Sequence, residues 1–253
     1  MSKITIRQWT TILITAAVIV MNFLANALPL NGLNTGEISD RFQVYFVPAG
    51  YVFSIWGLIY IGLIAFSLYQ ALPAQRENPR LQRIGNWYAL SGAANIAWLF
   101  LWHYEQFETT LFAMFTLLLA LIFIYLQLGI GKKPVGGLEK WVVDAPFSTY
   151  LGWVTVATIA NVTSVLGFVK WNGWGIAPQT WAVIMLGVAV LLAAIKSFTR
   201  RDVAFQLVLV WAFIGIALKQ AAAPLVANAA WAAAALVALF VGLVLLTNRR
   251  RKV

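Results

Sequence analysis

The sequence contains no cysteine, and charged residues make up only 10% of its 253 residues. Without cysteine the chain has no disulfide, no thiolate metal site and no cysteine nucleophile. Its one histidine, His103, would need two or more further protein ligands to hold a metal ion. Because soluble domains carry about 25% charged residues, the low charge excludes an ordinary soluble globule.

Hydrophobic residues make up 62% of the chain, and they occur in long runs separated by segments rich in Gly, Pro, Asn and charge. A membrane-spanning helix needs about 20 mostly apolar residues. We therefore expect an all-α, polytopic membrane protein with about eight transmembrane helices. The expected spans are Trp9–Leu30, Val47–Leu72, Ile84–Trp102, Thr109–Ile130, Pro146–Val169, Trp181–Ile195, Val203–Leu218 and Leu225–Leu246.

The distribution of Lys and Arg predicts the orientation of these spans, because both residues accumulate in short cytoplasmic loops. With the N-terminus inside, 15 of the 18 basic residues lie on the inner side, and only Arg41, Lys170 and Lys219 lie outside. This predicts an N-in, C-in protein of the bacterial cytoplasmic membrane. The net charge of +10 is dispersed over segments that flank the membrane, which indicates contact with membrane lipids and no nucleic-acid partner.

Catalytic groups are scarce in the sequence. All eight carboxylates fall in loops or at helix ends, so we expect no buried acidic pair for a proton relay. No nucleophile with an adjacent base is visible either. The sequence therefore favours a protein that is not an enzyme.

Aromatic and amide side chains recur at helical spacing inside three of the spans. Such stripes are typical of helix packing and interfacial anchoring, and equally of the walls of a cavity for a small hydrophobic molecule. The candidate ligand-binding residues are Phe53, Trp56, Tyr60, Asn95, Trp98, Trp102, Trp153 and Asn161.

Three short motifs carry a resemblance to a known family. They are Pro48-Ala-Gly-Tyr-Val-Phe-Ser-Ile-Trp-Gly-Leu-Ile-Tyr60, Asn95-Ile-Ala-Trp98 and Tyr150-Leu-Gly-Trp-Val-Thr-Val-Ala-Thr-Ile-Ala-Asn161. In this order and spacing they resemble the helix signatures of the TspO/MBR family, the tryptophan-rich sensory proteins.

The resemblance implies a five-helix transmembrane bundle over residues 1–170. It also implies a cavity for porphyrins, sterol-like molecules or other lipids, lined by Trp56, Asn95, Trp98 and Trp153 and closed by a lid at Asn31–Arg41. The family's Gly-Pro-Val before the tryptophan of the second helix is only Ser54-Ile55 here, which leaves the direction of Trp56 open. Residues 171–253 add three further helices and a basic tail.

Two functions stay open on this basis. The first is a membrane-embedded binding or sensory protein for a small hydrophobic ligand, and the alternative is a transporter of a neutral or hydrophobic solute. Neither needs an obligatory cofactor or a metal, and a porphyrin or haem-type ligand is compatible with the resemblance. Small residues in the added helices, notably Ala229–Ala235, allow close packing against the bundle or in a homo-oligomer.

The orientation can be tested with reporter fusions. A reporter that is active only outside the cytoplasm should give signal when it is fused after residue 36, and none when it is fused after residue 78 or at the C-terminus. The opposite pattern would overturn the N-in, C-in prediction.

Overall fold

The structure is a computed structural model that describes residues 4–28 and 30–250. These residues form an all-helical fold without strands, as the sequence predicts. Each expected apolar run coincides with one long helix. These helices are α1 (Ile6–Ala27), α3 (Ile55–Ala71), α4 (Pro79–His103), α5 (Phe107–Leu128), α7 (Ala145–Phe168), α8 (Pro178–Arg200), α9 (Val203–Lys219) and α10 (Pro224–Arg250).

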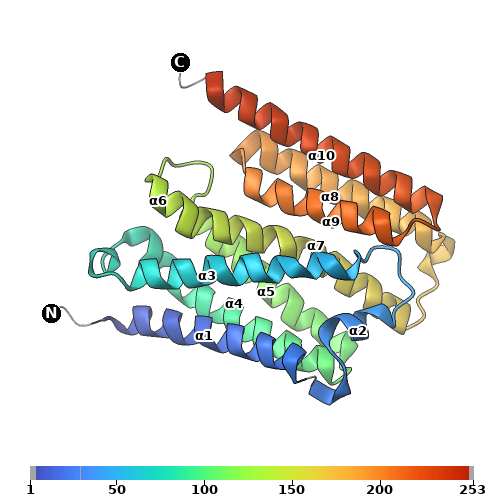
Figure 1. Ribbon diagram of the computed structural model, residues 1–253, viewed down its shortest axis with the longest axis horizontal. Coiled ribbons are helices and arrows are strands. Elements are labelled where there is room, and N and C mark those ends of the chain that lie inside the picture. Colours follow the sequence, from blue (N-terminus) through green and yellow to red (C-terminus); the bar gives the residue numbers. More distant parts are fainter. Residues whose placement is uncertain (1–3, 29, 251–253) are drawn as a thin grey trace.

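Not all of these helices are equally apolar. Among the described residues, six helical segments are long and apolar enough to cross a membrane, while α4 and α9 are not among them. Helix α9 is apolar but only 17 residues long. Helix α4 carries Ser91 and Asn95 in its interior and basic residues in its first turns. The chain is thus a multi-pass membrane protein, and α4 and α9 run within the same bundle (Figure 1).

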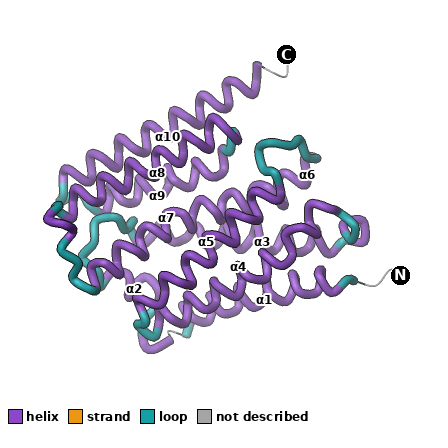
Figure 2. Tube along the Cα trace, turned by 180° about the vertical axis from the view of Figure 1, so that it is seen from behind, coloured by secondary structure: helices purple, strands orange, loops and turns teal. Residues whose placement is uncertain are grey.

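The helices lie side by side in three tiers, with α1, α4 and α5 in one, α3 and α7 in the middle, and α8, α9 and α10 in the third (Figures 1 and 2). Helix α1 begins and α10 ends at the same end of the bundle, which we name the inner end. The opposite end, the outer end, holds the short helix α2 (Thr35–Asp40). Among the basic residues of the orientation argument, Lys3, Arg251 and Lys252 lie outside the described residues.

Local sequence signals set the helix ends. Thr5 and Gln8 form a capping box at the start of α1, and Asp202 caps α9 by accepting a hydrogen bond from the Phe205 backbone N–H at 3.2 Å. Helix α5 stops at Gly129, whose φ of +65° is a left-handed conformation that glycine adopts without strain.

One hydrophobic core joins the first five long helices to the last three. It includes Trp153 of α7, Phe213 of α9 and Ala230 of α10 in a single cluster of buried residues. Gly152 makes the junction close, because a Cβ there would lie 3.1 Å from the Phe205 carbonyl oxygen. Alanines of α10 such as Ala233 are buried against α8 and α9, so these small residues serve packing within the chain.

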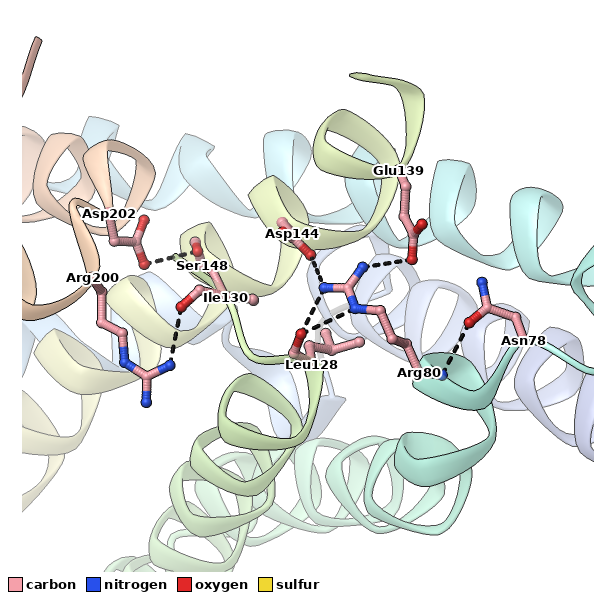
Figure 3. Close-up of polar contacts among 9 residues, drawn as sticks. All are labelled: Asn78, Arg80, Leu128, Ile130, Glu139, Asp144, Ser148, Arg200 and Asp202. Atoms are coloured by element: carbon pink, nitrogen blue, oxygen red, sulfur yellow. Dashed lines mark hydrogen bonds and ion pairs between the residues drawn. The ribbon is translucent and has the colours of Figure 1, made fainter. Parts of the chain in front are cut away.

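A polar network ties the helices together at the inner end (Figure 3). The Arg80 guanidinium forms ion pairs with Glu139 and Asp144 and donates two hydrogen bonds to the Leu128 carbonyl at 2.7 and 3.0 Å. Arg200 donates to the Ile130 carbonyl at 3.1 Å. Helices α4, α5, α7 and α8 are therefore fastened to one another at this end.

The carboxylates of this network correct the sequence analysis. Asp144 and Asp202 are each 7% exposed, so two of the carboxylates that the sequence places at helix ends are buried. They have different partners: Asp144 pairs with Arg80, and Asp202 accepts a hydrogen bond from the Ser148 hydroxyl at 2.8 Å. Both aspartates are at helix ends, as predicted, but the packing of α5, α7 and α9 covers them, and sequence position alone does not reveal that.

The inner network should be necessary for stability. Breaking a buried ion pair by removing one partner costs about 3–5 kcal/mol. We expect Arg80→Met to lower the midpoint of thermal unfolding in detergent markedly. The control is Arg41→Ala, which breaks the exposed Arg41–Glu105 pair and should cost at most about 1 kcal/mol. Equal effects of the two substitutions would contradict a structural role for the network.

Candidate functional site

A cavity of about 60 Å³ lies between α3, α4, α5 and α7. Helix α2 and residues 47–53 close it at the outer end. Most of its lining is apolar, and no lining residue carries a carboxylate, imidazole or amine. The residues that line it are Thr35, Ser39, Val47, Pro48, Phe53, Trp56, Asn95, Trp98, Trp102, Met114, Leu117, Trp153, Val154, Val156, Ala157, Ala160, Asn161 and Ser164.

Aromatic rings make two walls of this cavity. On α4, Trp98 and Trp102 are stacked, with ring centroids 5.3 Å apart and planes at 16°. On the opposite side, Trp153 of α7 meets Phe53 and Trp56 edge to face, at centroid distances of 5.5 and 6.2 Å. Such aromatic pairs are worth about 0.5–1.5 kcal/mol beyond their buried area, so the walls are rigid.

The amide of Asn95 links three helices across the bilayer interior. Its Nδ2 donates to the Tyr150 hydroxyl of α7 at 3.1 Å, and its Oδ1 accepts from Asn22 Nδ2 of α1 at 2.8 Å. An amide in hydrocarbon without a partner would cost several kcal/mol. Asn95 is therefore satisfied by the protein itself, and its first role is to hold α1, α4 and α7 at fixed positions around the cavity.

A second amide makes an equivalent link. Asn161 of α7 accepts from Trp98 Nε1 at 3.1 Å and donates through Nδ2 to Thr110 Oγ1 of α5 at 2.9 Å. Both asparagines are almost fully buried, at 2% and 4% exposure for Asn95 and Asn161. Together the two amides hold α1, α4, α5 and α7 in place. The Trp98 ring forms part of the cavity wall, and its N–H is already bonded to Asn161.

One polar atom at the cavity has no such partner. Trp153 is 2% exposed, and its indole N–H is buried without an acceptor among the described residues. Leaving a buried donor unpaired costs about 1–3 kcal/mol. Trp153 is a residue of the cavity wall, and its unpaired N–H is buried within that wall.

The last residues of α4 hold the segment that closes the cavity at the outer end. Trp102 Nε1 donates to the Thr35 carbonyl at 3.2 Å, and His103 Nε2 lies 3.0 Å from the Thr35 hydroxyl. His103 Nδ1 lies 3.2 Å from the Leu30 carbonyl. The histidine is 1% exposed, so it is a buried anchor for the segment around α2 and not an interfacial residue.

Seven of the eight candidate residues share this cavity: Phe53, Trp56, Asn95, Trp98, Trp102, Trp153 and Asn161. Tyr60 does not line the cavity. Its ring stacks on the ring of Trp56, with centroids 5.5 Å apart. The shortened motif before Trp56 does not turn that ring away. Trp56 lies against Trp153 and Tyr150.

Several lining or supporting residues were not among the candidates. Asn22, which supports Asn95, could have been found as an amide inside the first apolar run. Met114 and Leu117 of α5 give no signal, because every run contains similar residues. Thr35 and Ser39 lie within the segment that the resemblance marks as a lid, Asn31–Arg41, and they are the part of it that faces the cavity.

The described residues contain no group of three or more His, Cys, Asp or Glu side chains that could hold a metal ion. At the outer end, His103 and Glu105 both already have protein partners. The chemistry of the site is therefore that of aromatic surface, amide groups and one unpaired N–H.

Searches of curated proteins and of solved structures found no significant match. The family model described as "TSPO-like protein" matches residues 8–243, which include the cavity, six of the eight long helices in full, and most of α1 and α10. This match covers far more than half of the sequence and extends through the three helices after residue 170. The chain belongs to the TSPO-like protein family.

Proposed function

We propose that this protein binds a small hydrophobic ligand within the membrane, in the aromatic cavity between α3, α4, α5 and α7, and acts as a sensory or binding protein. The observation that carries the proposal is the buried, unpaired N–H of Trp153 in a cavity with aromatic walls. It calls for a flat apolar molecule with a hydrogen-bond acceptor. Porphyrins, sterol-like molecules and other lipids have these features.

The cavity volume limits how such a ligand can bind. Pockets that enclose drug-sized ligands measure about 300–1,000 Å³, whereas this cavity measures about 60 Å³. A porphyrin therefore requires the residues that close the outer end to move.

The membrane context completes the proposal. The distribution of basic residues supports the bacterial cytoplasmic membrane, with the cavity nearer the external side. Large apolar side chains such as Phe112 (78% exposed) and Phe198 (72% exposed) face outward, which suits contact with lipid.

A transporter of a neutral or hydrophobic solute is the second candidate. The observation in its favour is Gln206 of α9, which is 0% exposed and has no partner for either side-chain polar atom among the described residues. Polar groups of this kind can mark a solute or water path through a bundle. A labelled hydrophobic solute should accumulate in sealed vesicles if the protein transports, and should only bind saturably if it does not.

The binding site is tested by fluorescence titration of the purified protein with protoporphyrin IX, a sterol and a phospholipid. We expect Trp153→Phe to weaken binding of an acceptor-bearing ligand about two- to tenfold, which corresponds to one neutral hydrogen bond of about 0.5–1.5 kcal/mol. Trp98→Ala should weaken binding more, because it also removes packing area. Trp181→Ala, outside the cavity, should have no effect on affinity. Unchanged affinity in the first two folded variants would exclude this cavity as the site.

Binding should not depend on a metal ion. A chelator added to the purified protein should leave the dissociation constant for protoporphyrin IX unchanged, because the lining holds no metal-binding side chain. Loss of binding with the chelator, and recovery on addition of a divalent metal, would contradict the proposal and direct attention to His103 and the carboxylates of the outer loops.

A further inference from the structure

The three C-terminal helices contact the segment that closes the cavity. We name residues 30–54, which connect α1 to α3, the cover segment. Its N-terminal half is held by α4, through Trp102, His103 and Glu105. Its C-terminal half, which contributes Val47, Pro48 and Phe53 to the cavity wall, lies against α9.

The closest approach is at Gly215 of α9. The Ala49 backbone N–H donates to the Gly215 carbonyl at 3.1 Å. A Cβ at position 215 would lie 2.2 Å from Val52 Cγ2 and 3.1 Å from Pro48 Cβ, so only glycine fits. Val52 is 0% exposed because it fills this notch. Pro48 belongs to the cavity wall, so the notch sets the position of that wall.

A tryptophan one turn earlier on α9 strengthens the contact. Trp211 Nε1 donates to the Val52 carbonyl at 3.1 Å. Its ring also meets Tyr51 edge to face, with centroids 5.2 Å apart. The 3₁₀ turn Gly50–Ser54, which carries Phe53 into the cavity, is thereby fixed on its outer side.

Three polar side chains extend the contact along the cover segment. Gln220 Nε2 donates to the Val44 carbonyl at 3.3 Å, and Gln179 of α8 donates to the Tyr45 hydroxyl at 3.3 Å. Lys219 forms an ion pair with Asp40 at 2.8 Å. Two of these contacts are neutral hydrogen bonds, and the third is a partly exposed ion pair. Each is individually weak, so it can break and form again.

We propose that α8 and α9 act as a clamp on residues 40–52 of the cover segment and thereby set the rate at which a hydrophobic ligand reaches and leaves the cavity. The proposal rests on the proposed function, since it assigns a regulation to that same site. The small cavity volume requires the cover segment to move before a large ligand can bind. This movement breaks the clamp contacts between the cover segment and α9.

The clamp can be measured without a ligand, by amide hydrogen exchange of the full chain in detergent or lipid nanodiscs. Gly215→Ala should accelerate exchange across residues 42–52, including the Ala49 amide. The matched control is Gly187→Ala in α8, where an added Cβ meets nothing within 4 Å. Adding Val52→Ala to Gly215→Ala removes the clashing methyl groups and should restore part of the protection.

A second pair of variants makes a smaller change, so that a misfolded Gly215→Ala protein would not leave the clamp untested. Trp211→Phe removes the hydrogen bond to Val52 and should also accelerate exchange of residues 42–52, whereas Trp231→Phe on the exposed side of α10 should not. Exchange at wild-type rates in both Gly215→Ala and Trp211→Phe would overturn the clamp.

The link to ligand access is tested by stopped-flow quenching with protoporphyrin IX. Clamp variants should bind and release the porphyrin several-fold faster, with a smaller change in affinity, while Trp98→Ala should mainly change affinity. Faster exchange of residues 42–52 with unchanged binding and release rates would refute control of access and leave the binding site intact. If the wild-type protein binds none of the tested ligands, the proposed function fails, and hydrogen exchange alone decides whether α8 and α9 hold the cover segment.

Discussion

The organisation of this protein depends on one constraint, that the hydrocarbon core of a membrane offers no hydrogen-bond partner to a polar group. An amide placed there is therefore stabilised when it finds a partner on another helix. Asn95 does so through Asn22 and Tyr150, and Asn161 through Trp98 and Thr110. These two sets of bonds position α1, α4, α5 and α7, and the last three of these helices line the cavity. The cost of burying an amide thus becomes a means of fixing the geometry of a site that is otherwise apolar.

Helix periodicity was sufficient to predict much of this arrangement. The stripe of Asn95, Trp98 and Trp102 lies on one face of α4 as the spacing requires, and the stripe on α7 faces it. The failures concern contacts between distant parts of the chain. Asp144 and Asp202 were placed correctly at helix ends, but their burial depends on how α5, α7 and α9 converge. Within one helix, Tyr60 stacks on Trp56, and it is the one candidate residue that does not line the cavity.

The three helices after residue 170 were the least interpretable part of the sequence, because Ala, Val and Leu dominate them. Their structural relation to the rest becomes clear only at Gly215, Trp211 and Gln220, which meet backbone atoms of the cover segment. Because the partner in each contact is a backbone atom, any residue type could supply it. The sequence therefore gives no sign of these contacts. The family match through residue 243 agrees with a chain in which these helices and the cavity form one unit.

The two ends of the bundle differ in how far their ion pairs are buried. At that end Arg80 joins two carboxylates and a backbone carbonyl, with only 17% of its side chain exposed, and Arg200 ties α8 to the end of α5. At the outer end the ion pairs Arg41–Glu105 and Lys219–Asp40 are much more exposed to water. Water competes for exposed pairs and hardly for buried ones, so the outer end is the easier one to open. Under the proposed function, this difference would let a ligand enter and leave the cavity at the outer end and not at the inner end.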